Sequence, residues 1–246
     1  MNVNRLRLNS AKTEYIIFAS KGQRKKCSFN GIKINDAHIE EKICIKYLGV
    51  LLDNELSFRQ HINEKCKTAM YTLFRIRQLR CHLDRKSVEQ LVHSLVISQL
   101  DYCCTILYGL PKTVTCNLQR VQNFAAKIIL HKKKFDSASS CLRELHWLPI
   151  ESRILFRLLC MSFKCVHGLA PKYLLDMFTK LDCNYSLRSG GQYKIPRTNR
   201  KTLGDRSFSV AGPREWNNLP LDIRSCRTFP TFQSKLKTHL FRLAFK

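Results

Sequence analysis

The residues of this chain with metal-binding or nucleophilic chemistry are twelve cysteines and eight histidines. Structural zinc sites use paired ligands, yet no Cys-x-x-Cys pair occurs, and the closest grouping, Cys160, Cys165 and His167, lacks that pairing. Cys103 and Cys104 have no glycine-rich turn that would present a nucleophile. We therefore expect no metal site and no cysteine-based catalysis.

Cysteine placement and hydropathy also indicate the cellular compartment. Cys66, Cys103 and Cys160 fall within apolar helical patterns, which favours reduced, buried thiols and a nuclear or cytoplasmic protein. The sequence has no apolar run of 18 residues, and residues 1–20 lack the pattern of a signal peptide. We expect a soluble, intracellular protein without a membrane partner.

Lysine and arginine supply a second kind of chemistry, contact with a polyanion. The chain has 43 basic and 18 acidic residues, a net charge of +25. The excess is distributed, with +4 in residues 1–55, +10 in 56–135 and +11 in 136–246. Nucleic acid is the commonest partner of such a chain, so it is the partner we expect. A solvated basic surface and a membrane-facing surface are the alternatives.

Residues 1–55 have the pattern of β-strands. Apolar residues predict strands at 3–8, 14–18 and 43–52, and Asn30-Gly31 is typical of a tight hairpin turn. This β-rich stretch is too short to form a stable domain alone.

The hydrophobic period changes from two to 3.6 residues at Ser57. Ser57 and Gln60 have the spacing of a capping box, which predicts a helix start. A second helix is expected from Lys86 to the Leu110-Pro111 pair, and a third over 114–129. Three amphipathic helices with short connections predict a bundle over residues 56–135. The apolar stripe of the first helix is Phe58, Ile62, Cys66, Ala69, Leu73 and Ile76.

Residues 136–246 predict an α-rich domain with irregular β structure. We expect a helix that ends at Gly168, a short helix after Pro171, and a last helix from Phe229. Residues 182–206 are polar and basic, and predict a loop, whereas Pro213 to Pro220 predicts turns. The expected fold class of the chain is therefore α+β.

Four ordered blocks resemble the reverse transcriptases of non-LTR retrotransposons, of the jockey and chicken-repeat type. The first, Leu6 to Glu14, is similar to the L-x-L-N-x-x-K-T-E segment that follows the catalytic Asp-Asp turn in the palm of that family. The second, Lys46 to Asp53, resembles its primer-grip strand pair. Leu145 to Ile150 and Ser209 to Pro220 resemble blocks near the C-terminal end of such polyproteins. The resemblance spans essentially the whole chain.

The resemblance implies three regions: a palm remnant with primer-grip-like strands over 1–55, a thumb-like helical bundle over 56–135, and the family's C-terminal region over 136–246. In the intact family enzyme, Mg²⁺ ions on upstream carboxylates stabilise the attacking and leaving oxygens. No Asp-Asp pair occurs in this sequence. We therefore expect no cofactor for this chain, with Mg²⁺ needed only by an upstream polymerase portion.

The same resemblance points to site residues in the palm-like region. Lys12 is similar to the family lysine that protonates the leaving pyrophosphate, here a vestigial general acid. A solvated turn lysine near Glu14 is the alternative. Tyr47, Leu48 and Gly49 resemble the primer grip, where glycine permits close backbone approach. An ordinary core strand with a glycine bend explains them equally well.

Basic side chains of the thumb-like region are the predicted nucleic-acid contacts. Thumb helices follow the phosphates of an A-form duplex by shape and charge. The alternatives are a solvated helix face and, after the third helix, complementarity to the helix dipole. The predicted set is Lys65, Lys67, Arg75, Arg77, Arg80, Lys132, Lys133 and Lys134.

Three functions remain open from the sequence. The chain is a module that binds RNA or an RNA–DNA duplex without sequence specificity, the C-terminal portion of an active RNA-directed DNA polymerase, or an inert transposon relic. The partners are accordingly RNA, an RNA–DNA duplex or an upstream polymerase portion.

The chain alone should not extend a primer, because its sequence has no Asp-Asp pair to hold two metal ions. The test incubates it with a primed RNA template, deoxynucleotides and Mg²⁺ or Mn²⁺. Template-dependent extension above that of a mock preparation contradicts this expectation.

Overall fold

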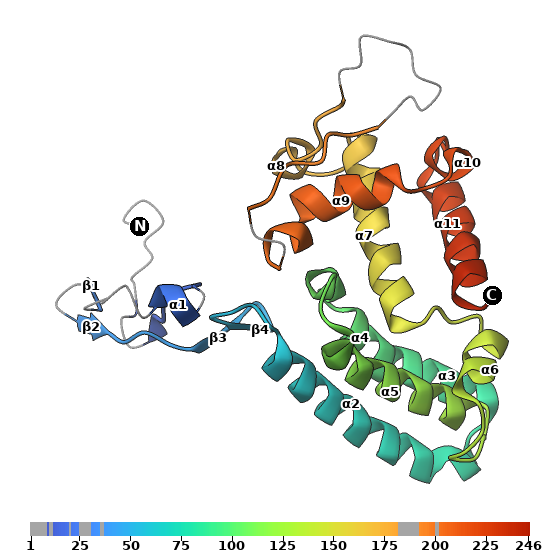
Figure 1. The fold of residues 1–246 in the computed structure, drawn as a ribbon. Helices are drawn as coiled ribbons and strands as arrows, with labels where there is room; N and C mark the ends of the chain where they lie inside the picture. The colour runs from blue at the N-terminus through green and yellow to red at the C-terminus, as the bar shows by residue number, and fades with distance from the viewer. Residues whose placement is uncertain are drawn as a thin grey trace. The chain divides into compact units, whose positions relative to one another are not determined.

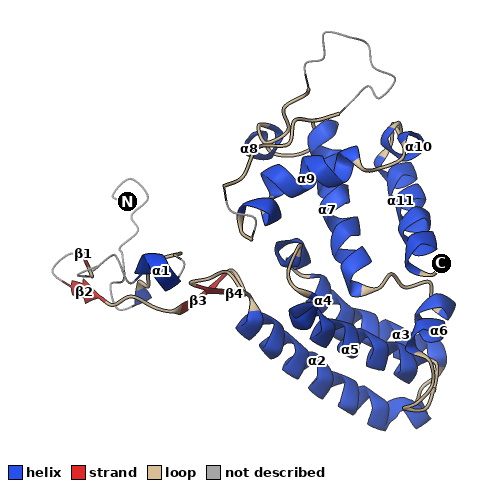
Figure 2. Cartoon of the chain, in the orientation of Figure 1, coloured by secondary structure: helices blue, strands red, loops and turns tan. Residues whose placement is uncertain are grey.

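The computed structural model describes residues 9, 12–19, 21–24, 31–34, 37–181, 192–199 and 202–246. Helices dominate and strands are few, so the predicted α+β class is confirmed (Figures 1 and 2). The chain divides into two compact units, Met1–Glu64 and Lys65–Lys246. This division does not test whether residues 1–55, 56–135 and 136–246 are three separate regions, so these boundaries stay predictions.

The described strands of the first unit form two antiparallel hairpins. Strand β1 (Ile32–Ile34) pairs with β2 (Ala37–Ile39), and β3 (Cys44–Tyr47) pairs with β4 (Val50–Asp53). Leu48 and Gly49 join β3 to β4 with φ values of 45° and 80°. Positive φ at both central residues gives a turn whose twist matches that of the strands. A short helix, α1 (Lys21–Arg24), precedes the hairpins.

One strand prediction for this unit is wrong, and two other predictions fall wholly or partly on residues outside those that the structure describes. Residues 14–18 form no regular strand, because only Tyr15 makes a bridge, to Glu41. The tight turn predicted at Asn30-Gly31 includes Asn30, which lies outside the described residues. Gly31 has a positive φ of 80°, and a Cβ on it would lie 2.3 Å from an atom of the His38 ring. The strand predicted at 3–8 falls on residues that the structure does not describe.

Helix α2 (Arg59–Leu79) begins one residue later than a Ser57 cap requires. The Asp53 carboxylate, at the end of β4, accepts hydrogen bonds from the amides of Ser57 at 2.9 Å and Phe58 at 2.7 Å. The predicted capping box is therefore wrong, because a carboxylate from the preceding strand takes its place. The predicted apolar stripe is confirmed, as Phe58, Ile62, Ala69, Leu73 and Ile76 are buried and Cys66 is half-buried.

The second predicted helix is shorter and less regular than the sequence pattern suggests. It comprises α3 (Arg85–Val92), a π-helical turn (His93–Ile97) and α4 (Ser98–Asp101). Cys103 is exposed and adopts a left-handed φ of 54°, which ends the helix before Leu110. The wider π turn also leaves Leu95 exposed, although the sequence pattern places it on the apolar stripe.

Three helices follow, and each ends with the same backbone motif. Helices α5 (Lys112–Ile129), α6 (Ala138–Glu144) and α7 (Ile150–Val166) are each followed by a residue with positive φ. The next amide then donates to a carbonyl five residues back, as in a Schellman motif. The residues with positive φ are His131, His146 and the predicted stop Gly168, and the amide donors are Lys132, Trp147 and Leu169.

The C-terminal helices pack around α7. Helices α9 (Phe208–Asn217) and α11 (Phe229–Ala244) contact α7 from two sides, as Figure 1 shows. Helices α8 (Lys172–Leu175) and α10 (Leu221–Arg224) are short. The largest fully buried side chains here are Phe163, Trp216 and Phe232, whose rings lie 4.5 to 6.3 Å apart.

Helix α9 corrects the prediction of turns over Pro213 to Pro220. Proline normally clashes with the Cβ of the residue before it in a helix, but that residue is Gly212, which has none. A Cβ on Gly212 would also lie 2.8 Å from the Phe178 ring. Gly212 therefore removes one of the steric conflicts of an internal proline and leaves room for the Phe178 ring against α9.

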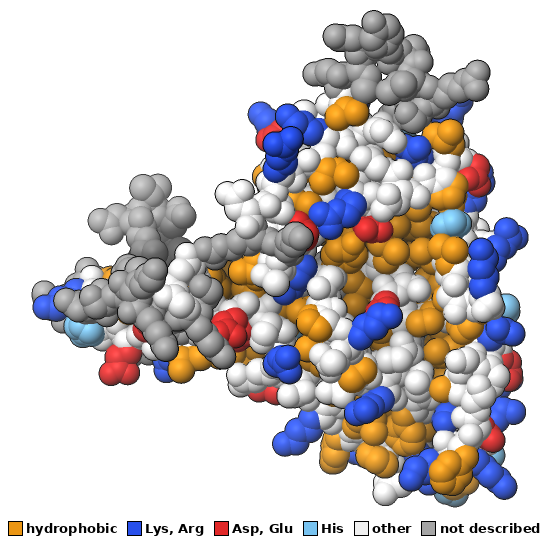
Figure 3. All heavy atoms as spheres, viewed as in Figure 1, with side chains coloured by type: hydrophobic (Ala, Val, Ile, Leu, Met, Phe, Trp, Pro, Cys, Tyr) orange, Lys and Arg blue, Asp and Glu red, His pale blue; other side chains and the backbone are white. Residues whose placement is uncertain are grey.

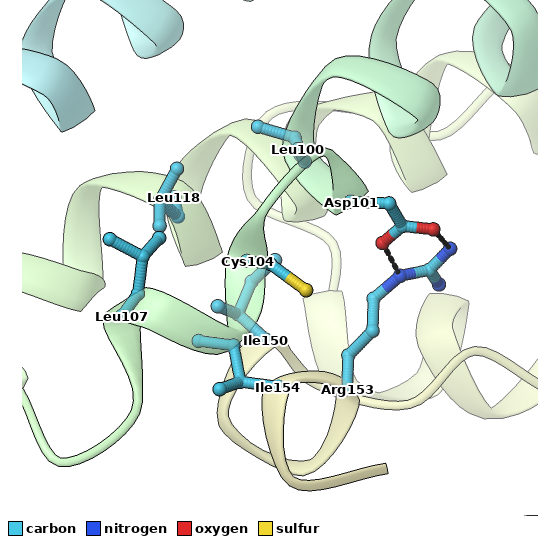
Figure 4. A pocket seen from close by; sticks show the side chains of 8 residues that line it. All are labelled: Leu100, Asp101, Cys104, Leu107, Leu118, Ile150, Arg153 and Ile154. Atoms are coloured by element: carbon cyan, nitrogen blue, oxygen red, sulfur yellow. Dashed lines mark hydrogen bonds and ion pairs between the residues drawn. The ribbon is translucent and has the colours of Figure 1, made fainter. Parts of the chain in front are cut away.

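An ion cluster joins α4 to α7 (Figure 4). Arg153 donates through both Nε and Nη2 to the largely buried Asp101 carboxylate, and Nη2 lies 2.8 Å from Oδ2. Arg157 Nη2 approaches the same oxygen at 2.9 Å. Burial opposes the charge of Asp101, but hydrogen bonds and the charges of the two arginines lower its pKa below the ordinary value. A cavity of about 10 Å³ beside the cluster is too small for an organic ligand.

Asp101→Asn should destabilise the protein by about 3 kcal/mol at pH 7, because it leaves two arginines without their carboxylate. The folded pKa of Asp101 is lowered, so its contribution is present above the unfolded pKa and disappears as pH falls through the folded pKa. Urea unfolding from pH 7 to pH 3 should therefore show the wild type and the variant converging. Exposed Asp176→Asn is the matched control, expected within about 0.5 kcal/mol of wild type. A pH-independent difference for Asp101→Asn contradicts the assignment.

Candidate nucleic-acid interface

Lys65, predicted to contact phosphate, is bound by the protein's own backbone. Its Nζ donates to the carbonyl oxygens of Gln99 at 2.6 Å and Tyr102 at 3.3 Å, and lies 5.0 Å from the centroid of the Tyr102 ring. Burial lowers the pKa of Lys65, although the nearby thiols of Cys103 and Cys104 oppose this. Lys65 therefore stabilises the end of α4, and we remove it from the predicted contacts.

Arg80 also points inward. Its Nη1 donates to the Leu83 carbonyl at 2.8 Å, while Nε and Nη2 donate to Ile128 and Ile129 at 3.3 and 3.5 Å. The Ile128 and Ile129 carbonyls belong to the last turn of α5, and the Ile128 carbonyl also accepts from the His131 amide at 3.3 Å. Arg80 caps α5 and does not belong to the candidate interface.

The other predicted residues of α2 are exposed. Lys67, Arg75 and Arg77 lie away from the buried stripe of the helix. At 100° per residue, Lys67, Tyr71 and Arg75 follow one another along one face, and the Arg75 guanidinium lies 5.9 Å from the Tyr71 ring centroid. Figure 3 shows basic and hydrophobic side chains interspersed in this part of the surface.

Helix α5 extends this surface. The Phe74 ring of α2 lies 5.4 Å from the Phe124 ring of α5, which brings the outward sides of the two helices together. Arg120, one turn before Phe124, is exposed, and its guanidinium donates to the Asn117 side chain on the same helix at 3.3 Å. Arg120 is not among the contacts predicted from the sequence, although its position four residues before a half-exposed aromatic indicates an outward face.

The basic segment after α5 is held in place. Lys127 Nζ donates to the Lys134 carbonyl at 2.6 Å, and the Lys133 amide donates to the Asp136 carboxylate at 2.6 Å. The side chains of Lys132, Lys133 and Lys134 are exposed. These predicted contacts therefore stand on an ordered turn at the C-terminal end of α5, where the helix dipole also favours positive charge.

Acidic residues are absent from two stretches of the sequence that contain most of α2 and all of α5. None occurs between Lys65 and Leu83, or between Tyr102 and Phe135. We define the α2–α5 face as the exposed Lys, Arg, Phe and Tyr residues of 67–77 and 120–135, together with half-exposed Phe124, which contacts Phe74. The two stretches themselves supply no carboxylate to this face. The members of the α2–α5 face are Lys67, Tyr71, Phe74, Arg75, Arg77, Arg120, Phe124, Lys132, Lys133, Lys134 and Phe135.

The palm-like site residues belong to the first unit. Tyr47, Leu48 and Gly49 are exposed at the tip of the β3–β4 hairpin, so they are not part of a buried core strand. Lys12 is also exposed. Glu14, suggested as its neighbour, forms its ion pair with Lys42 at 3.8 Å.

Thiol and metal chemistry find little support in the described part of the chain. Burial raises the pKa values of Cys104, Cys160 and Cys165 to about 11, which keeps these thiols protonated and unreactive at neutral pH. Among the described residues, no group of three or more His, Cys, Asp or Glu side chains could hold a metal ion.

The described helices include none long and apolar enough to cross a membrane. The tryptophans pack internally: Trp147 is buried against His93, and Trp216 lies in the α7 core.

Comparison with known proteins adds no identification. No protein-family model, curated protein sequence or solved structure matches the chain.

Lys65→Met and Lys67→Met should separate a structural lysine from an interface lysine. Lys65→Met should lower the free energy of unfolding by about 2 kcal/mol, because it removes charged hydrogen bonds to two carbonyls. Lys67→Met should change stability by less than about 0.5 kcal/mol, since its side chain is exposed. Urea unfolding measures both. Equal stability of the two variants contradicts the inward placement of Lys65.

Proposed function

We propose that this chain binds RNA or an RNA–DNA duplex without sequence specificity, through the α2–α5 face. The supporting observation is a surface of outward Lys and Arg side chains in two stretches whose sequence has no acidic residue. Phosphate oxygens are the natural partners of such a surface, because each contact releases condensed counterions. The resemblance to the thumb and C-terminal region of a non-LTR reverse transcriptase supports the same function.

The arrangement of the cations suits backbone contact. Arg75 and Arg77 present planar donor forks from one end of α2, and three lysines follow the end of α5. Contacts of this kind position a nucleic acid but carry no sequence information. The proposed binding is therefore tolerant of sequence, and it places the protein in the nucleus or the cytoplasm.

A second candidate is the C-terminal portion of a polymerase whose catalytic carboxylates are upstream or on another chain. It is favoured by the β3–β4 hairpin, whose exposed tip of Tyr47, Leu48 and Gly49 suits the primer-grip role that the family resemblance implies. Such an enzyme would use the α2–α5 face in the same way, with Mg²⁺ held outside this chain.

Replacing Lys67, Arg75 and Arg77 together with glutamine should weaken binding to an RNA–DNA duplex and reduce its dependence on salt. Each lost phosphate contact should lower the slope of log affinity against log salt by about 0.7 to 0.9. Fluorescence anisotropy with a labelled 20-base-pair duplex, between 50 and 200 mM KCl, measures both quantities.

The matched control replaces one lysine and two arginines elsewhere, Lys237, Arg227 and Arg242, which are exposed near or on α11. It makes the same change in net charge. Equal weakening by both triple variants means that only the overall charge matters and overturns the α2–α5 face. Absence of salt-dependent binding in the wild type removes the proposed function and leaves an inert relic.

A further inference from the structure

Three aromatic side chains of the α2–α5 face are exposed to solvent over half of their surface or more. The exposed fractions are 65% for Tyr71, 50% for Phe74 and 92% for Phe135. Large aromatic side chains normally contribute most to stability when they are buried. A group of exposed rings on one charged surface therefore indicates a binding partner that covers them.

Each of the two most exposed rings has a cation beside it. The Arg75 guanidinium lies 5.9 Å from the Tyr71 centroid, and the Lys134 ammonium lies 5.7 Å from the Phe135 centroid. Phe74, the least exposed of the three, packs against the Phe124 ring at a centroid distance of 5.4 Å. Two rings of the face therefore each lie beside a positive charge, whereas a surface that contacts phosphates alone needs only the charges.

This combination distinguishes between forms of RNA. In a duplex the bases are stacked on one another, and protein side chains meet phosphates and 2′-hydroxyl groups. In a single strand the bases are free to stack on aromatic side chains while the phosphates contact nearby cations. When an arginine lies next to an aromatic ring, the arginine can contact the phosphate of a nucleotide while the ring stacks on its base.

We infer that the α2–α5 face binds unpaired RNA in preference to a blunt duplex, with a base stacked on Tyr71 and the adjoining phosphates on Arg75 and Lys67. This inference rests on the proposed function and specifies its substrate. The partner is anionic because no carboxylate occurs in either stretch of the face. Its bases are unpaired because Tyr71 offers an exposed ring that a stacked duplex cannot use.

The test uses the full chain and two labelled RNAs of equal length, an unstructured 20-nucleotide strand and a blunt 20-base-pair duplex. Tyr71→Leu keeps an apolar side chain on the exposed helix face but removes the ring. It should weaken binding to the single strand about tenfold and change binding to the duplex less than twofold, since stacking on one ring contributes roughly one order of magnitude per base.

Tyr173→Leu is the matched control, because Tyr173 on α8 is 66% exposed and lies outside the α2–α5 face. It should leave both affinities unchanged, and circular dichroism should show native helix content for both variants. The inference is overturned when the wild type binds the duplex as tightly as the single strand, or when Tyr71→Leu weakens both RNAs equally or neither.

The charge variant of Lys67, Arg75 and Arg77 separates this inference from the proposed function. If the charge variant binds both RNAs more weakly but Tyr71→Leu has no effect, the binding face is retained and base stacking on Tyr71 is overturned. If the charge variant binds both RNAs as tightly as the wild type does, the proposed function itself is overturned. Tyr71 would then be tested as a contact for a protein partner.

Discussion

Asp101 keeps its charge in a largely buried position, and the second unit depends on how that charge is balanced. The carboxylate lies at the C-terminal end of α4, where the helix dipole disfavours a negative group. Two arginines from α7 offset both the dipole and the loss of water. Removing either kind of partner would leave a buried charge alone, which costs more than the complete pair contributes.

The same helix end also fixes α2. Lys65 donates to carbonyls of Gln99 and Tyr102, beside the residue that Arg153 and Arg157 hold. The end of α4 is therefore the place where α2 and α7 are both attached through charged hydrogen bonds. Because Lys65 anchors one side of α2, the opposite side, with Lys67, is turned outward. The orientation of the candidate interface follows from a contact that contains no interface residue.

The basic excess divides into two groups with different physical roles. Lys65, Arg80 and Arg153 satisfy carbonyls or a carboxylate inside the unit, where each charge has a geometric partner. The exposed group on α2 and after α5 repels itself, and such repulsion lowers the stability of a compact state. Under the proposed function, a bound nucleic acid would neutralise these charges and relieve that repulsion.

The sequence could predict the long helices because their buried stripes repeat regularly. The stripe of α2 was read correctly from Phe58 to Ile76, and the third helix matches α5. Errors arose where a distant group decides the local structure. Asp53 replaces Ser57 at the start of α2, and Gly212 allows Pro213 inside α9. Residue type alone could not separate Lys65 from Lys67, but helical position could, because Lys65 follows buried Ile62 by three residues.

Exposed rings change what a positive surface can distinguish. Coulombic contact depends on phosphate density and is screened by salt, so cations alone favour whichever nucleic acid has the denser charge. A duplex has that advantage over a single strand. Stacking depends on access to a base face, so under the proposed binding Tyr71 would act in the opposite direction. On a face that holds both, the cations would set how tightly RNA binds and the ring would set which form of RNA is preferred.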